Sequence, residues 1–142
     1  MKFVLDASVA LSWLLEDAGP GQHYAAAVFN TLTRPDAAAH VPVTWGLEIA
    51  NVIAMCESRG DLLEGRSQAF LISLDAAPIL PDPATYAKTL HETLDLARRY
   101  RLSSYDASYL ELALRTMLPL ATLDADLRRA ASRDGVERFT PA

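Results

Sequence analysis

Short apolar runs alternate along the chain with longer stretches in which apolar residues recur every three to four positions. The short runs predict buried strands at Lys2–Leu5, Ala39–Val41, Pro78–Leu80, Leu118–Thr122 and Val136–Phe139. The longer stretches predict helices at Ala7–Leu15, Gln22–Leu32, Thr44–Ser58, Leu62–Leu74, Ala84–Tyr100, Ser104–Arg115 and Asp124–Ser132. The first helix is expected to end in the segment 16–20, which contains Gly19 and Pro20. Strands that alternate with helices indicate an α/β fold, with a parallel sheet covered by helices on both faces.

Composition narrows the class of protein. The chain has 142 residues, of which 51% are hydrophobic and 22% charged, and this predicts a single globular domain over residues 1–142. No apolar run is long enough to cross a membrane, and the acid at position 6 is unlike a secretion signal. Cys56 is the one cysteine, which excludes an intrachain disulfide and a cysteine-based zinc site. An intracellular, cytoplasmic protein is expected.

Four acidic residues lie where a sheet of this kind places its ligands. Asp6 and Asp124 each follow a predicted strand, and parallel sheets bind ligands beyond the carboxyl ends of their strands. Asp106 begins a helix, and its neighbours on the same helical face are apolar. Glu48 and Asn51 share a face of an otherwise apolar helix, and Glu48 has no Lys or Arg within four positions.

Each acid also has a purely structural interpretation. Asp6 and Asp124 could cap the helices that follow them, and Ser103 with Asp106 fits a capping box. Glu48 is the hardest to explain in this way, because its helix offers it no ion pair. Taken together, the four positions predict carboxylates that converge beyond one edge of the sheet.

Converging carboxylates repel one another, and the pKa of at least one of them rises unless a cation joins them. Mg²⁺ and Mn²⁺ are hard ions that take oxygen ligands, so they suit such a site. These ions polarise phosphoryl oxygens and activate water, which points to hydrolysis of a phosphate ester. Residues 97–142 contain eight arginines, and most of them flank Asp106 and Asp124. Solvated helix faces explain most of these arginines individually, but the arrangement also leaves contacts with phosphate groups open.

Other chemistries find little support. The histidines have no metal-ligand spacing, and the chain has no phosphate-binding glycine loop and no serine-hydrolase elbow. Trp13, Trp45 and the tyrosines are interpreted as core residues. The net charge of −5 argues against a general coat for nucleic acids.

Four segments, in order along nearly the whole chain, resemble the motifs of PIN-domain proteins and, more narrowly, of VapC-type toxins of toxin–antitoxin modules. The segments are FVLDASVALSWLLED, LEIAN, LSSYDASYLELAL and LATLDADLRRAA. The resemblance implies a three-layer α/β/α sandwich with a mainly parallel sheet, and endoribonuclease activity that depends on Mg²⁺ or Mn²⁺. It further implies an RNA substrate, a homodimer and a cognate antitoxin protein that blocks the site.

The same resemblance assigns the acidic positions of the family to Asp6, Glu48, Asp106 and Asp124. Asp6 and Asp106 are expected to bind the metal most directly. Glu48 and Asp124 are expected to complete the pocket, either directly or through water, and to orient the attacking water.

Three polar residues are expected to support these carboxylates from behind. They are Ser8, Asn51 and Thr122. Asp126 lies two positions after Asp124 and competes with it for the fourth acidic position, but the hydroxyl of Thr122 favours Asp124.

Two alternative functions remain open on the sequence. A small Asp-based metal-dependent phosphatase also places an acid after its first strand, but one of the haloacid type would need Asp at position 8, where this chain has Ser8. A non-catalytic PIN-like binding module is the other alternative, and the presence of all four acids argues against it.

Overall fold

The computed structural model describes residues 1–15 and 19–142, so most of the segment predicted to end the first helix lies outside the described residues. The strands are β1 (Lys2–Leu5), β2 (Ala38–Val41), β3 (Ile79–Pro81) and β4 (Leu120–Ala121). The helices are α1 (Ala7–Leu15), α2 (Pro20–Leu32), α3 (Trp45–Ser58), α4 (Glu64–Ala76), α5 (Thr85–Lys88), α6 (Leu94–Tyr100), α7 (Ser104–Thr116) and α8 (Ala125–Arg133). A π-helical segment, η1 (Thr89–Thr93), joins α5 to α6.

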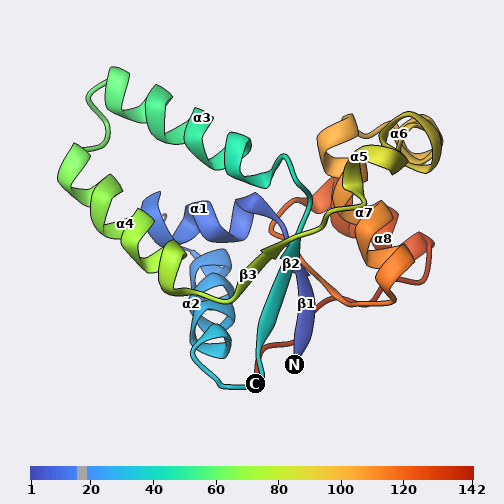
Figure 1. Ribbon diagram of the computed structural model, residues 1–142, viewed down its shortest axis with the longest axis horizontal. Coiled ribbons are helices and arrows are strands. Elements are labelled where there is room, and N and C mark those ends of the chain that lie inside the picture. Colours follow the sequence, from blue (N-terminus) through green and yellow to red (C-terminus); the bar gives the residue numbers. More distant parts are fainter. Residues whose placement is uncertain (16–18) are drawn as a thin grey trace.

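The four described strands form one parallel sheet in the order β3-β2-β1-β4. In Figure 1 the sheet runs through the middle of the molecule, with α1 to α4 on one side and α5 to α8 on the other. Phe3, Val4 and Leu5 of β1 are all 0% exposed, although successive side chains of a strand point to opposite faces. Both faces of the sheet are therefore covered, which confirms the α/β/α fold predicted from the sequence.

The core explains why α3 and α7 lie where they do. α7 is buried along most of its length, and Tyr109 and Leu110 are 0% exposed. α3 buries Trp45, Ile49 and Ile53, which recur every four positions and so form one stripe along the helix. Both helices begin beyond the carboxyl edge of the sheet, and this arrangement brings their first turns close to the ends of β1 and β4.

The strand predicted over residues 136–139 does not form, so this prediction is wrong. Residues 136–139 form one isolated bridge, between Leu120 and Arg138, rather than a strand. β4 has only two residues, and the segment makes two backbone hydrogen bonds with one of them, Leu120. Its end is held by stacking of Phe139 on Phe3, with ring centroids 4.0 Å apart. Only Phe139 of this segment is buried, whereas Glu137 and Arg138 are exposed, so the segment is anchored by one side chain and not by strand pairing.

The predicted helix over residues 84–100 is also corrected, because it consists of α5, η1 and α6 in succession. A π turn holds more residues than an α turn, so it shifts the buried face along the helix and leaves Thr93 and Leu96 in the core. Two tyrosines interpreted as core residues are exposed instead, since Tyr86 is 86% and Tyr105 58% accessible. Among the described residues no helix is both long and apolar enough to span a membrane.

Candidate active site

Asp6 occupies the turn between β1 and α1, at the carboxyl edge of the sheet. Asp6 is buried, with only 4% of its surface exposed. Its Oδ2 atom accepts hydrogen bonds from the hydroxyls of Ser8, at 2.7 Å, and Thr122, at 2.6 Å. The second bond joins residues that are 116 positions apart. The fold therefore brings together two ends of the chain around this carboxylate, as the strand-end positions predicted.

The hydroxyls of Ser8 and Thr122 each have one proton, and both protons are directed at Asp6. Ser8 Oγ accepts from the backbone N–H of Leu123, at 3.1 Å, and Thr122 Oγ1 accepts from that of Asp124, at 3.0 Å. These backbone groups can only donate, so they fix the direction of each hydroxyl. Asp6 is therefore held as a hydrogen-bond acceptor with a fixed orientation.

Burial raises the pKa of Asp6 above its ordinary value. The hydrogen bonds from Thr122 and Ser8 act in the opposite direction, because they favour the charged carboxylate. The negative charge of Asp124 raises the pKa further. Asp6 is thus a desolvated acid whose charged form needs a positive partner.

Glu48 projects from the first turn of α3 toward α7. Its Oε2 accepts a hydrogen bond from the Tyr109 hydroxyl at 2.8 Å, whereas its Oε1 is buried and has no hydrogen-bond partner among the described residues. Its pKa is raised to about 7, first by burial and then by the charges of Asp6 and Asp106. A buried oxygen without a partner, on a carboxylate repelled by its neighbours, is an open ligand position.

Asp106 and Asp124 lie at the starts of α7 and α8. Burial raises the pKa of Asp106, and the charges of Asp6 and Asp124 raise it further. The cap of α7 is made by Ser103, whose Oγ accepts from the backbone N–H of Asp106 at 3.1 Å. Asp124 caps α8, with Oδ1 accepting from the N–H of Leu127 at 2.7 Å. The capping interpretations are thus confirmed for Ser103 and Asp124. A side-chain hydrogen bond with Ser103 acts against the rise in the pKa of Asp106.

Two residues considered in the sequence lie elsewhere. Asn51 is exposed, and its amide lies 3.8 Å from the sulfur of Met55, one turn along α3, so it is not hydrogen-bonded to Glu48. Asp126 is exposed and forms an ion pair with Arg129 on the surface of α8. Of the residues expected behind the acids, the structure brings Ser8 and Thr122 to them and leaves Asn51 outside.

A comparison with known protein families identifies the fold family. The PIN domain family matches residues 3–133, which is nearly the whole chain. The chain is a PIN-domain protein. PIN domains are generally metal-dependent nucleases, so the family fits hydrolytic chemistry at the cluster of acids.

The fold of this PIN domain also matches solved structures. The crystal structure of PAE2754 from Pyrobaculum aerophilum aligns with a TM-score of 0.65 and 23% sequence identity, over 92% of this chain and 79% of that chain. At this level of identity the match shows the shared fold. No curated protein matches the chain significantly.

The residues of this PIN domain fit a divalent cation. Within residues 1–15 and 19–142, no group of three or more His, Cys, Asp or Glu side chains is already arranged to hold a metal ion. The donor set is nevertheless suited to Mg²⁺ or Mn²⁺, because its members are carboxylates that raise one another's pKa. Glu48 adds a buried oxygen without a partner. A cation among these groups would relieve their repulsion.

Tyr109 is a residue of the site that the sequence interpretation missed. It is 0% exposed, yet its hydroxyl both donates to Glu48 and accepts from the backbone N–H of Ala7, at 3.3 Å. The sequence placed it on the apolar face of its helix with Asp106, three positions earlier. A tyrosine on the same face as a desolvated acid was the available signal, because a buried hydroxyl needs a partner.

Proposed function

We propose that this PIN domain is an Mg²⁺- or Mn²⁺-dependent endoribonuclease and acts as the toxin of a VapC-type toxin–antitoxin pair. The observation that carries the proposal is the set of four acids at one edge of the sheet, with Glu48 Oε1 buried and unpaired. The negative charges of neighbouring acids raise the pKa of Asp6, Glu48 and Asp106. The four toxin-like sequence segments supply all of these acids. The cognate antitoxin would be a separate protein that covers them.

Each acid has a role in this proposal. Asp6 and Asp106 hold the cation, with Glu48 and Asp124 completing the site directly or through water. A bound divalent ion would neutralise charge on the phosphate and lower the pKa of water, so that the water could lose a proton near neutral pH and attack the phosphorus as hydroxide. Glu48 Oε1 is the acceptor available to orient that water, because its other oxygen is held by Tyr109.

Arginines around β4 and α8 support an anionic substrate. Arg128 donates to the backbone carbonyl of Thr122 at 3.3 Å, which places a guanidinium next to the residue that supports Asp6. Arg128, Arg129 and Arg138 line a pocket of about 590 Å³ together with Thr122. Guanidinium groups bind phosphates well, so this pocket suits the phosphate backbone of an RNA strand.

Replacement of Asp6 by Asn tests the mechanism. The hydroxyls of Ser8 and Thr122 both donate, so the new side chain must turn its carbonyl oxygen to them and its NH₂ group toward the cation position. The variant is expected to fold. It should lose at least about 100-fold in cleavage of single-stranded RNA with Mn²⁺, because loss of a ligand exceeds the usual 10–100-fold effect of disturbing a group behind one.

The matched control is Asp61→Asn, which changes an exposed acid in the loop between α3 and α4. Products should carry 5′-phosphate ends, since water and not the ribose 2′-OH is the nucleophile. Cleavage that persists in EDTA, or an Asp6→Asn variant as fast as the control, would contradict the nuclease proposal.

The toxin role has its own test. Expression of the wild-type chain should arrest growth of a bacterial host, whereas Asp6→Asn should not. Normal growth of the host with well-expressed, RNA-cleaving protein would leave the nuclease standing and refute the toxin role.

A further inference from the structure

Tyr109 connects Glu48 to the turn that carries Asp6. Its hydroxyl is 2.8 Å from Glu48 Oε2 and 3.3 Å from the backbone nitrogen of Ala7, the residue next to Asp6. The three groups come from α7, α3 and the turn after β1, and Tyr109 and Glu48 are 61 positions apart in the sequence. One side chain therefore sets the distance between elements that the chain brings together only on folding.

The direction of these hydrogen bonds is determined by chemistry. The N–H of Ala7 can only donate, so the Tyr109 oxygen accepts from it. The single hydroxyl proton is then directed at Glu48, which must present an oxygen acceptor. Tyr109 consequently occupies one of the two carboxylate oxygens and leaves Oε1 turned away from it, buried and without a partner.

Glu48 needs such support because its other neighbours repel it. The carboxylates of Asp6 and Asp106 disfavour its charged form, and no ion pair to Glu48 occurs in the described part of the chain. A side chain with three rotatable bonds under this repulsion would otherwise turn out toward water.

We propose that Tyr109 is a positioning residue that holds the Glu48 carboxylate in the site, so that Oε1 faces the position of the divalent cation. The inference rests on the proposed metal-dependent function and assigns to Tyr109 a part of it. A metal ligand depends on the group behind it, and loss of such a group typically weakens metal binding 10–100-fold.

The alternative is that the hydrogen bonds of the Tyr109 hydroxyl only compensate for its burial in the core. The two interpretations differ in what they predict for metal affinity. A purely structural tyrosine would change the unfolding temperature but not the affinity of the folded protein for a cation, whereas a positioning tyrosine changes both.

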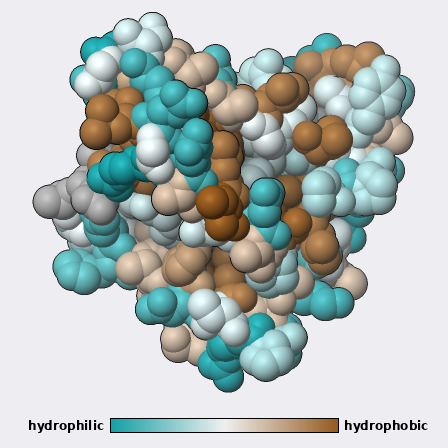
Figure 2. Space-filling model, turned by 60° about the vertical axis from the view of Figure 1, so that its left-hand side comes forward, coloured by the Kyte–Doolittle hydropathy of each residue, from teal (hydrophilic) through white to brown (hydrophobic). Residues whose placement is uncertain are grey.

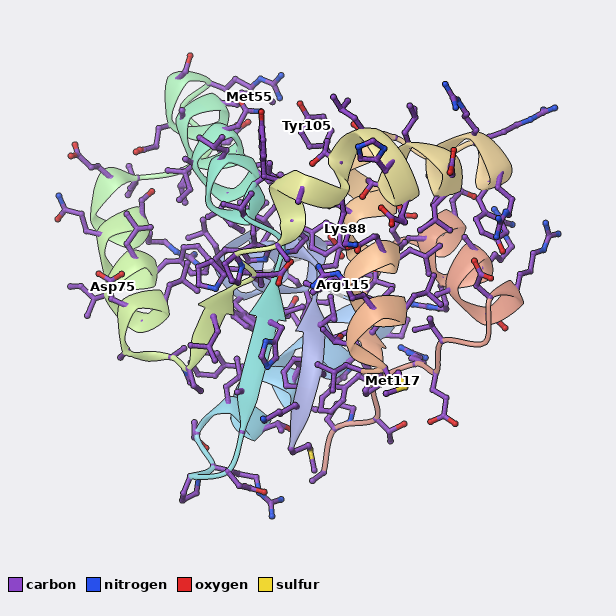
Figure 3. The ribbon with its side chains drawn as sticks, turned by 45° about the vertical axis from the view of Figure 1, so that its right-hand side comes forward. Met55, Asp75, Lys88, Tyr105, Arg115 and Met117 are labelled. Carbon is purple, nitrogen blue, oxygen red and sulfur yellow. The ribbon has the colours of Figure 1, made fainter. Side chains whose placement is uncertain are left out.

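Tyr109→Phe tests the proposal, since it keeps the ring that fills the core and removes only the hydroxyl. Binding of Mn²⁺ alone, without RNA, is measured by titration calorimetry, and thermal unfolding shows that the variant is folded. The Kd is expected to rise about 10–100-fold. The control is Tyr105→Phe on the same helix, which is 58% exposed, lies at the surface in Figure 3 and should bind Mn²⁺ like the wild type.

A double-mutant cycle shows whether Tyr109 acts through Glu48. In the Glu48→Gln background, Tyr109→Phe should cause no further loss of Mn²⁺ affinity, because the side chain it positions has already lost its charge. Additive losses would overturn the proposal, as would a Tyr109→Phe variant with wild-type affinity. If the wild type itself bound no Mn²⁺, the metal-dependent function would fail and this inference with it, so the two failures are distinguishable.

Discussion

Glu48 holds its proton more tightly in the folded protein than in the unfolded chain, because its pKa is raised from 4.5 to about 7. A carboxylic acid with a raised pKa stabilises the fold below its unfolded pKa, and this contribution is lost as the pH rises through its folded pKa. The metal-free protein should therefore melt at a lower temperature at pH 8 than at pH 5. Thermal unfolding in EDTA across this range measures the change.

Glu48→Gln should flatten this pH dependence, because the group that titrates is removed. Glu64→Gln, an exposed acid at the start of α4, is the matched control and should melt like the wild type at each pH. Parallel curves for the wild type and Glu48→Gln would show that Glu48 has an ordinary pKa.

Asp106→Asn is expected to raise the melting temperature of the metal-free protein and to reduce the stabilisation by added Mn²⁺. The change removes a charge that Asp6 and Asp124 repel. It leaves the helix cap in place, because the bond from the backbone N–H of this residue to Ser103 Oγ does not involve the side chain. Stabilisation by a ligand follows from its affinity for the folded state, so a weaker site gives a smaller shift. A lower melting temperature without metal would assign the carboxylate a stabilising role.

The sequence predicted correctly that acids lie at the ends of strands, but it did not predict the contacts of the residues around them. Asp6 and Asp124 follow from the rule for parallel sheets, which needs only local apolar runs. Asn51 shares a face with Glu48 in the helical repeat, yet its amide turns along α3 to Met55. Tyr109 meets Glu48 across 61 positions, and no helical or strand period carries information over that distance.

At the scale of elements, Asp82 at the carboxyl end of β3 has a purely structural role. Asp82 is buried next to β3 and binds Arg115 of α7, with Oδ2 2.5 Å from Nη2. It also accepts from Thr85 Oγ1 at 2.8 Å, and Arg115 binds Glu111 at 2.7 Å. These bonds tie β3, α5 and α7 together, away from the acids of the site.

Arg115→Ala is therefore expected to destabilise the protein by roughly 3 kcal/mol, because Asp82 and Glu111 would be left buried without a cation. Urea unfolding measures the loss. Arg98→Ala is the control, since its ion pair with Asp95 on α6 is exposed and such pairs contribute about 0–1 kcal/mol. Equal losses in the two variants would contradict a structural role for the buried cluster.

Helices and strands were predicted correctly where a pattern within the segment itself determines them. Helix α1 and strand β1 were predicted with the bounds that they have. The π segment was not, because apolar spacing does not distinguish a wider turn from an α turn. The segment 136–139 alternates poorly, with Glu137 and Arg138 between Val136 and Phe139, and β4 offers it only two residues as a partner.

At the scale of the molecule, apolar side chains remain exposed on α3, α4 and the loop between them. Those exposed by 40% or more are Leu47, Met55, Leu63, Leu71 and Ile72. A groove of about 550 Å³ runs between the two helices and reaches β3. Figure 2 turns this side of the molecule forward and shows hydrophobic surface between hydrophilic ridges. Exposed apolar surface of this kind favours association, so we propose that two copies of the chain meet here.

Sedimentation at micromolar concentration is expected to give about twice the 15.5 kDa of one chain. Ile72→Glu should shift the protein toward the monomer, because the charge would be buried between the copies. Leu90→Glu changes an equally exposed residue in η1 and should leave the assembly unchanged. A monomeric wild-type protein would refute the homodimer.

The central place of β1 in the sheet also has a consequence during synthesis. β1 is made first, but it pairs with β2 at residues 38–41 and with β4 at residues 120–121. Asp6 obtains its bond from Thr122 only after 116 further residues have been added. Contacts so distant in sequence cannot form until both partners have left the ribosome. A nascent chain of this protein therefore cannot complete its cluster of acids before Thr122 and Asp124 have left the ribosome.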